Sequence, residues 1–147
     1  GAVDLPVHFS RCCNPVPGDE IVGFITRGRG ITIHRTDCIN VMNIPEEEKM
    51  RLVEAVWEED ILLEKANEAF ETTIKIFADN RKGLLVDISK VFTEKDIDIL
   101  SINTRISKTG IASIVISFQI KDKHELNDIF KRIRAIESVT DVKRAMG

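Results

Sequence analysis

The chain has 147 residues, of which 43% are hydrophobic, and a formal net charge of −3 at pH 7. This length suffices for one ordinary domain or two small ones. No apolar run approaches the roughly 18 residues that cross a bilayer, so we expect a cytoplasmic protein without a membrane partner. Residues 1–69 hold 13 acidic and 7 basic side chains, whereas residues 70–147 hold 11 and 14. This balance excludes a surface that coats nucleic acid, but it is compatible with a small basic face.

The first part of the chain, residues 1–57, has the pattern of a small β-rich domain. Strands are expected over residues 7–10, 21–26 and 31–33, with a hairpin turn at residues 27–30. Residues 37–43 favour a short helical turn, and a proline followed by three glutamates at 45–48 favours the start of a helix. A closing strand over residues 51–57 would complete this domain.

One segment of this domain, residues 11–38, holds all three cysteines of the chain and one of its three histidines. Cys12 and Cys13 are adjacent, and His34 is followed four residues later by Cys38. Three thiolates and one imidazole form a complete tetrahedral ligand set for Zn²⁺. The residue types therefore indicate a metal site.

The spacing of these residues constrains the backbone. Adjacent side chains of a strand point to opposite faces, so the two neighbouring cysteines reach one ion only where the chain is not extended. The Asn-Pro-Val-Pro-Gly run at residues 14–18 supplies such a turn. The histidine and the last cysteine would share a face if residues 34–38 formed a helical turn. Asp37 would then be an acceptor for the imidazole N–H.

Other interpretations of these residues remain open. A cysteine is usually a small buried hydrophobic residue, and three cysteines could be only that. A disulfide is disfavoured by the odd count and by the lack of a visible signal peptide. A cysteine nucleophile with His34 as its base is a further alternative. His8 is expected to be an edge-strand side chain rather than a ligand.

The same segment resembles the zinc-finger (RIS) region of the Rel family, the RelA/SpoT (p)ppGpp synthetase/hydrolases. The matching residues are Cys-Cys-Asn-Pro-Val-Pro-Gly-Asp at 12–19, Gly-Phe-Ile-Thr-Arg-Gly-Arg-Gly at 23–30 and Ile-His-Arg-x-Asp-Cys at 33–38. In that family the adjacent cysteines, the histidine and the last cysteine are the zinc ligands. The resemblance therefore implies that Zn is bound by Cys12, Cys13, His34 and Cys38.

Three arginines of this region are candidates for contact with RNA. Glycine alone would satisfy the turn at residues 27–30, so the turn does not explain why Arg27 and Arg29 are arginines. Arg35 follows the histidine and is expected near the same end of the domain. Guanidinium groups bind phosphate oxygens in two-point contacts, and we predict that these arginines bind the RNA backbone. An ordinary solvated turn is the alternative.

The pattern changes after a charge-rich stretch at residues 58–69, which we interpret as an acidic linker. Strands are expected over 70–78, 97–106, 111–120 and 139–145, and helices over 84–92 and 124–136. The order βαββαβ is the ferredoxin-like arrangement of one antiparallel sheet backed by two helices. The chain is therefore predicted to be an α+β protein with a zinc-finger-like β-rich domain at 1–57 and a ferredoxin-like domain at 70–147.

This second domain resembles an ACT domain. The resemblance rests on Ala-Asp-Asn-Arg-Lys-Gly-Leu-Leu at residues 78–85, in which an aspartate precedes Gly-Leu-Leu at the first strand-to-helix turn. In ACT domains that bind amino acids, this glycine lets the ligand approach the backbone at a dimer interface. The implied effector-binding residues are Asn80, Gly83, Leu84, Leu85 and, on the second strand, Asn103. The alternative is that the glycine only permits a tight turn.

Together the two resemblances cover nearly the whole chain and imply a non-catalytic C-terminal regulatory fragment of a GTP pyrophosphokinase/(p)ppGpp hydrolase. In that family this end engages large-subunit rRNA of the ribosome, reports on uncharged tRNA in the A site and restrains the catalytic domains. The alternative function is an amino-acid-sensing ACT module. A free edge strand and an apolar helix face also predict a homodimer formed through residues 70–147.

Overall fold

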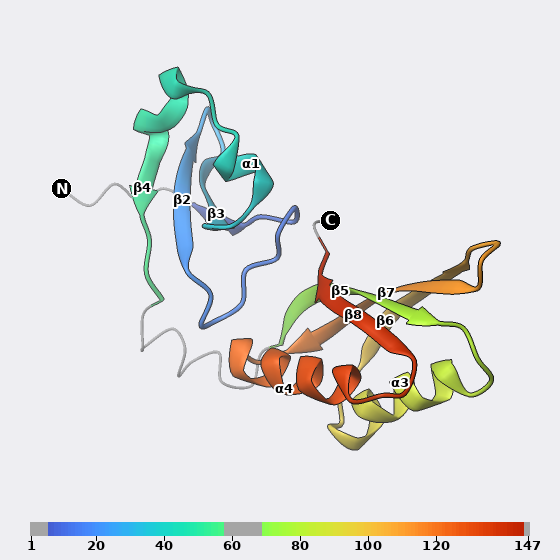
Figure 1. Cartoon of the computed structure of the whole chain (residues 1–147). Coiled ribbons are helices and arrows are strands. Elements are labelled where there is room, and N and C mark those ends of the chain that lie inside the picture. Colours follow the sequence, from blue (N-terminus) through green and yellow to red (C-terminus); the bar gives the residue numbers. More distant parts are fainter. Residues whose placement is uncertain (1–5, 58–68, 146–147) are drawn as a thin grey trace.

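The computed structural model describes residues 6–57 and 69–145, which form two β-sheets with short helices (Figure 1). The first sheet has the order β1-β3-β2-β4. Its strands are β1 (Val7–Phe9), β2 (Ile21–Thr26), β3 (Gly30–Arg35) and β4 (Leu52–Glu54). The β1 strand runs parallel to β3, whereas β2 is antiparallel to both of its neighbours. Helix α1 (Ile39–Met42) and the 3₁₀ helix η1 (Glu46–Arg51) connect β3 to β4.

The second sheet is antiparallel and has the order β6-β7-β5-β8. Its elements, in chain order, are β5 (Phe70–Asp79), α3 (Leu84–Glu94), β6 (Ile99–Ile106), β7 (Ile111–Ile120), α4 (Lys123–Arg134) and β8 (Val139–Arg144). Both helices lie against one face of this sheet (Figure 1). The predicted α+β class and the βαββαβ order are confirmed.

The main hydrophobic core lies between this sheet and its two helices. Alternate residues of β7 are buried because successive side chains of a strand point to opposite faces. Phe118 on β7 meets Phe92 of α3 edge to face, with 4.9 Å between ring centroids. The apolar stripe of α4 completes the core with Leu126, Ile129 and Ile133.

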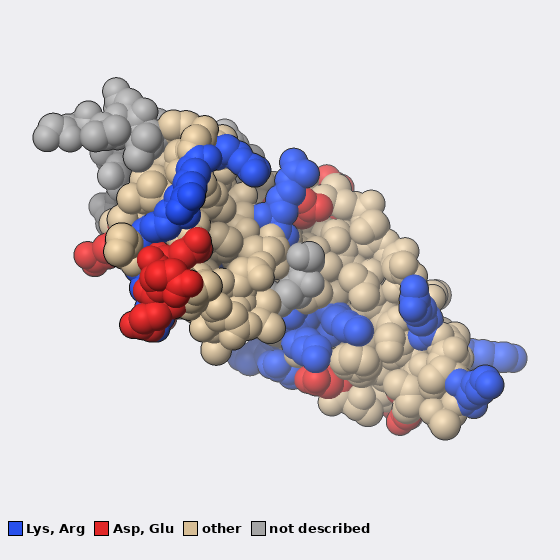
Figure 2. Space-filling model, turned by 90° about the horizontal axis from the view of Figure 1, so that it is seen from above, with Lys and Arg blue, Asp and Glu red and all other residues tan. Residues whose placement is uncertain are grey.

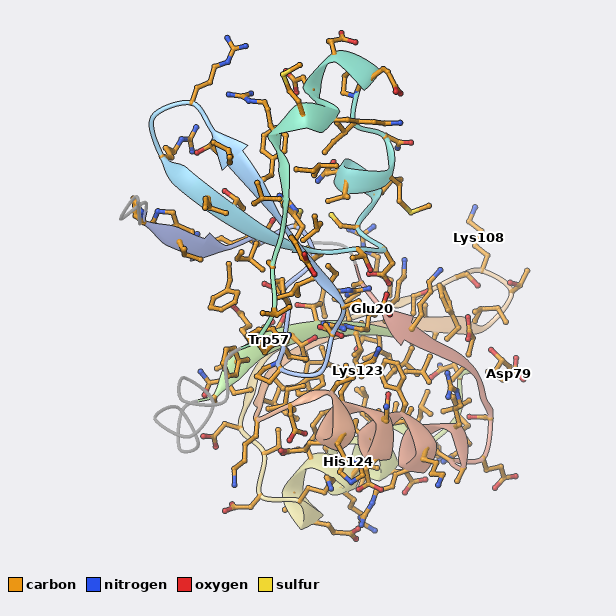
Figure 3. All side chains as sticks on the ribbon, turned by 90° about the vertical axis from the view of Figure 1, so that its left-hand side faces the viewer. Glu20, Trp57, Asp79, Lys108, Lys123 and His124 are labelled. Carbon is orange, nitrogen blue, oxygen red and sulfur yellow. The ribbon has the colours of Figure 1, made fainter. Side chains whose placement is uncertain are left out.

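The two sheets meet at an aromatic cluster formed by Phe9, Trp57 and Phe70. The rings of Phe9 and Trp57 stack at 5.5 Å, and Phe70 meets each of them edge-on at 6.0 Å. Figure 3 shows Trp57 beside the start of β5, with Glu20 and Lys123 also where the two sheets approach each other.

Several elements differ locally from the sequence-based expectations. The expected helix after Pro45 is the 3₁₀ helix η1, and the closing strand is shorter, at Leu52–Glu54. The second strand of the ferredoxin-like part begins at Ile99 rather than residue 97, and a bulge at Leu100 takes that side chain out of the expected alternation. The predicted linker falls almost entirely on residues 58–68, which lie outside the described residues.

Across residues 6–57 and 69–145, no helix combines the length and the apolar character needed to cross a membrane.

Candidate metal centre

Parallel pairing of β1 and β3 brings the cysteine pair to the histidine. Phe9 of β1 lies opposite Ile33 of β3, and the next backbone N–H, of Ser10, donates to the carbonyl of Ile33 at 2.9 Å. The chain then leaves β1 and turns through Cys12 and Cys13. The cysteine pair therefore lies beside the end of β3 that carries His34.

The backbone turns at the cysteine pair, as expected. The N–H of Asn14 donates to the carbonyl of Ser10 at 3.0 Å, and Asn14 has a positive φ of 47°. This left-handed conformation is one that asparagine tolerates better than most residues. Because the chain is not extended here, both neighbouring thiols reach the same side of the sheet end.

The expected helical turn over residues 34–38 is wrong. His34 is still in β3, and the strand continues to Arg35. A reverse turn follows, in which the N–H of Cys38 donates to the carbonyl of Arg35 at 3.0 Å. His34 and Cys38 thus come close to each other through a strand end followed by a turn. A helical turn does not form because pairing with β2 keeps residue 34 extended.

The four donor atoms lie within 4.8 Å of one another. The sulfur of Cys12 lies 3.3 Å from that of Cys38, 4.0 Å from that of Cys13 and 3.4 Å from Nδ1 of His34. The sulfur of Cys13 lies 3.9 Å from the same nitrogen. A tetrahedral zinc ion at about 2.3 Å from sulfur and about 2.0–2.1 Å from nitrogen separates its donors by about 3.5–3.8 Å. The arrangement therefore fits a tetrahedral ion of this size.

The protein environment disfavours charge on most of these donors. Burial opposes ionisation of Cys12, yet hydrogen bonds from Ser10 and Asn40 outweigh it and keep the pKa of this thiol below its ordinary value. Burial raises the pKa of Cys13 to about 12 and also raises the pKa of Cys38.

The histidine is held in the form that binds metals. Burial lowers the pKa of His34 and favours the neutral imidazole. A coordinated thiol is deprotonated by the cation itself. A bound divalent ion would therefore favour the thiolate form of the cysteines, whereas burial alone favours the protonated thiol.

Asp37 does not serve the imidazole as predicted. Its two carboxylate oxygens accept from Nε and Nη2 of Arg35 at 2.8 and 2.7 Å, in a two-point ion pair. The hydrogen bonds from Arg35 lower the pKa of Asp37. Arg35 also donates from its backbone to the sulfur of Cys13 at 3.3 Å and from Nη1 to the carbonyl of Cys13 at 3.2 Å. This arginine therefore positions Cys13.

The geometry bears on each of the alternatives to a metal site. All three thiols are free, so no disulfide forms within the described residues. Cys13 and Cys38 are buried, whereas a nucleophile must be accessible to its substrate. Cys12 is partly exposed, and its sulfur lies 3.4 Å from Nδ1 of His34, so a nucleophile with His34 as its base stays an alternative for this thiol alone. His8 is exposed on β1, an edge strand, as expected, and is not part of the cluster.

The predicted RNA-binding arginines separate into two groups. Arg27 and Arg29 are exposed at the turn between β2 and β3 and form a basic tip. The prediction that Arg35 lies near that tip is wrong, because β3 runs from Gly30 beside the tip to Arg35 at its opposite end. Arg35 is buried and is engaged by Asp37, so it is unavailable to a nucleic acid.

Sequence reasoning missed two residues that extend the basic tip. The guanidinium of Arg51 lies over the ring of Phe24, 5.3 Å from its centroid. Both line an open concavity of about 530 Å³ together with Arg27, Arg29 and Glu48, whose carboxylate lies 4.0 Å from Nη1 of Arg51. Figure 2 shows acidic and basic side chains side by side on the face viewed from above, and no single charge covers that face. The sequence offered no signal for Arg51, which η1 brings across from another part of the chain.

Four of the five predicted effector residues line one recess of about 170 Å³. These residues are Asn80, Gly83, Leu84 and Leu85. Gly83 has a φ of 79° immediately before α3, a conformation that favours glycine. Asn103 is not part of the recess: it pairs with Val115 on the sheet face away from the helices. Thr104, one residue further along, lines the recess instead, because side chains alternate along β6.

Comparisons with known proteins match both parts of the chain. Residues 1–58 match the family model of the RelA/SpoT RIS domain, and residues 66–144 match that of the ACT domain. The sequence is 35% identical over 144 residues to the GTP pyrophosphokinase of Streptomyces coelicolor, covering 98% of this chain and 16% of that protein. It is 33% identical over 148 residues to the GTP pyrophosphokinase of Escherichia coli K12, covering 100% of this chain and 19% of that protein.

The chain thus spans less than a fifth of the length of these curated relatives. Among solved structures, it is similar to the crystal structure of the ACT domain from the GTP pyrophosphokinase of Chlorobium tepidum. The identity is 24% and the TM-score 0.47, over 52% of this chain and 97% of that one.

Proposed function

Because this chain belongs to the ACT-domain family and carries the RIS domain of RelA/SpoT proteins, we propose that it is a non-catalytic regulatory part of a stringent-response (p)ppGpp synthetase/hydrolase. Its first domain engages large-subunit rRNA of the ribosome in the cytoplasm, where the full-length protein also meets uncharged tRNA in the A site. Its second domain restrains the catalytic domains of the same enzyme. The observation that supports this role is the exposed basic tip on a domain with a compact four-donor cluster.

The four donors hold one structural zinc ion. The donor set is that of structural zinc sites, which are closed by four protein ligands. A domain of about 50 residues buries little core, and a structural metal commonly supplies the missing stability. Elemental analysis of the purified chain should find one zinc per polypeptide. Absence of bound metal from protein purified without chelator would refute this assignment.

The basic tip supplies the attraction to RNA. Zn²⁺ with three thiolates and a neutral imidazole has a net charge of −1, so the metal centre does not attract phosphate. Arg27 and Arg29 are exposed, and they share a concavity with Arg51. One guanidinium group can donate hydrogen bonds to two phosphate oxygens at once, and structured RNA is recognised through its shape and backbone. The domain therefore binds rRNA without strong base specificity.

A matched pair of double variants tests this role. Arg27→Glu with Arg29→Glu should weaken binding to 70S ribosomes and reduce the slope of log affinity against log salt by about 1.5 units, because each lost phosphate contact lowers it by roughly 0.7–0.9. The control is Arg105→Glu with Lys108→Glu, which makes the same charge change at exposed positions of the second domain; Lys108 lies on its β6–β7 hairpin (Figure 3). The proposal fails if both double variants bind ribosomes equally well at every salt concentration.

A second candidate function is amino-acid sensing by the ACT domain. The recess beside Gly83 places the free N–H groups that begin α3 next to apolar side chains, and such N–H groups suit a carboxylate. Its volume of about 170 Å³ is below the roughly 300 Å³ of an ordinary ligand pocket. A second protomer would have to complete the site.

The surface around the recess supports a homodimer. The β6 strand is at the edge of its sheet, and large apolar side chains on α3 and β6 are exposed beside it. They are Leu85, Val86, Leu100, Ile102 and Ile106.

Calorimetry with valine, leucine and isoleucine should detect binding at micromolar to millimolar ligand if this domain is a sensor. No heat with any of the three would refute sensing of these amino acids.

A further inference from the structure

The loop of residues 14–19, which we call the linking loop, begins directly after Cys13 and contacts the ACT domain. Val16, at its centre, has no exposed surface and belongs to the hydrophobic core of that domain. Val16 precedes β5 by more than 50 residues and lies on the same chain segment as the metal centre. One side chain of the RIS domain is therefore buried inside the ACT domain.

A buried ion pair holds the same loop. Oδ1 of Asp19 lies 2.7 Å from Nη1 of Arg144, the last residue of β8, and the two side chains are only 4% and 10% exposed. Nη2 of Arg144 donates to the carbonyl of Asn14 at 2.9 Å. The other carboxylate oxygen of Asp19 accepts from the N–H of Val16 at 2.8 Å. A buried pair of this kind becomes costly as soon as one partner withdraws, so the loop and β8 hold each other in place.

The backbone of the loop also pairs with the start of α4. The N–H of Lys123, in the first turn of α4, donates to the carbonyl of Pro17 at 2.8 Å. Gly18 has a φ of 101°, and a Cβ there would lie 3.0 Å from the Cβ of Lys123. The fit is close enough that the loop must keep its conformation to remain docked.

The opposite end of the loop is held by the metal centre. Cys13 precedes Asn14, whose carbonyl accepts from Arg144, and the carbonyl and sulfur of Cys13 both accept from Arg35. A shift of Cys13 therefore moves the first residue of the linking loop. The position of this ligand and the docking of the loop are mechanically joined.

We propose that the metal ion controls the docking of the two domains: metal bound at the four donors holds the linking loop in the ACT domain, and metal loss releases it. This inference rests on the zinc site proposed above. Release withdraws Val16 and leaves a gap in the hydrophobic core of the ACT domain. The coupling is reciprocal, because anything that undocks the loop must weaken metal binding by the same factor.

The chain contains a natural reporter of this docking. Trp57 is its single tryptophan. The indole Nε1 donates to the carbonyl of Asp19 in the linking loop at 3.0 Å, and the ring packs between Phe9 of the RIS domain and Phe70 of the ACT domain. Its fluorescence emission therefore responds to solvent entry at the contact between the domains.

The test removes zinc from the intact chain with a chelator while metal content, Trp57 emission and amide hydrogen exchange are followed together. We expect a red shift of the emission and faster exchange at Lys123 and in β8, with β7 still protected. Exchange within the ACT domain distinguishes undocking from mere loosening of the RIS domain. Metal loss without any change in α4 or β8 would overturn this inference alone. A chain that never contained metal would overturn both this inference and the zinc site.

A variant tests the reciprocal effect without touching a ligand. Arg144→Gln should weaken zinc binding by about 5- to 150-fold, the usual range of coupling between sites. The control is Lys95→Gln, which breaks an ion pair with Asp128 inside the ACT domain, away from the loop. Equal zinc affinities of both variants and the unaltered chain would overturn the coupling.

Discussion

Substitutions at two glycines of the basic tip can test how β1 is held against β3. Gly28 and Gly30 have nearly the same backbone conformation, with φ values of 86° and 83°. An added Cβ at Gly28 would meet nothing within 4 Å. At Gly30 it would lie 2.1 Å from the carbonyl oxygen of Pro6, just before β1. Alanine at the two positions therefore imposes the same strain but a very different clash.

The expected free energies follow from these contacts. A left-handed conformation costs a non-glycine residue about 1–2 kcal/mol, and this is the whole effect expected of Gly28→Ala. Gly30→Ala must also push away the backbone of Pro6, whose carbonyl accepts from Ile31 at 2.8 Å. Loss of that hydrogen bond adds about 1 kcal/mol, and displacement of β1 adds lost packing. We expect a total of about 3 kcal/mol, because a shifted β1 also loses the stacking of Phe9 on Trp57, and an aromatic pair is worth about 0.5–1.5 kcal/mol.

Urea unfolding followed by Trp57 fluorescence measures the difference. Gly30→Ala should also lower zinc content, because β1 leads directly into the cysteine pair, whereas Gly28→Ala should leave it unchanged. If Gly30→Ala destabilises the chain no more than Gly28→Ala, then β1 is not held against β3 by the contact at Pro6 and the reasoning is refuted.

Three further outcomes are expected. Cys38→Ser should abolish zinc retention in elemental analysis while far-UV circular dichroism still shows the helices of the ACT domain; retained zinc would contradict the four-ligand site. Ile102→Glu should convert a dimer to a monomer in light scattering, because it places a charge in the exposed apolar surface of β6; an unchanged mass would exclude this edge as the interface. Phe118→Ala should cost about 3–5 kcal/mol of unfolding free energy, because it empties the centre of the core; a loss below 1 kcal/mol would contradict the packing.

Much of the metal centre could be predicted from residue types and local chemistry. Three cysteines and a histidine in one short segment indicated a candidate tetrahedral site, and the structure brings their donor atoms together. The turn that adjacent ligands need lies at residues 11–13, and only Asn14 of the Asn-Pro-Val-Pro-Gly run takes part in closing it. The way His34 and Cys38 converge could not be predicted, because a strand end with a reverse turn and a helical turn both suit that spacing. Pairing with β2 decided between them.

The roles of individual polar side chains were harder to predict. Arg35 resembles the tip arginines in sequence, but burial and the carboxylate of Asp37 make it a support for Cys13. Asn103 was assigned to the effector recess, whereas strand alternation gives that place to Thr104. A sequence shows which groups can form ion pairs and hydrogen bonds, but not which partner comes near enough to form them.

By itself, the sequence determined the α+β class and the βαββαβ order, because these follow from hydrophobic periodicity and turn residues within each segment. Only the tertiary structure decided that β1 joins its sheet in parallel, that Val16 enters the core of the other domain and that Asp19 pairs with Arg144. These contacts join residues far apart in the chain, and local patterns carry no information about them. The contacts of Val16 and Asp19 with the other domain depend on shape and charge complementarity that exists only once both domains have folded.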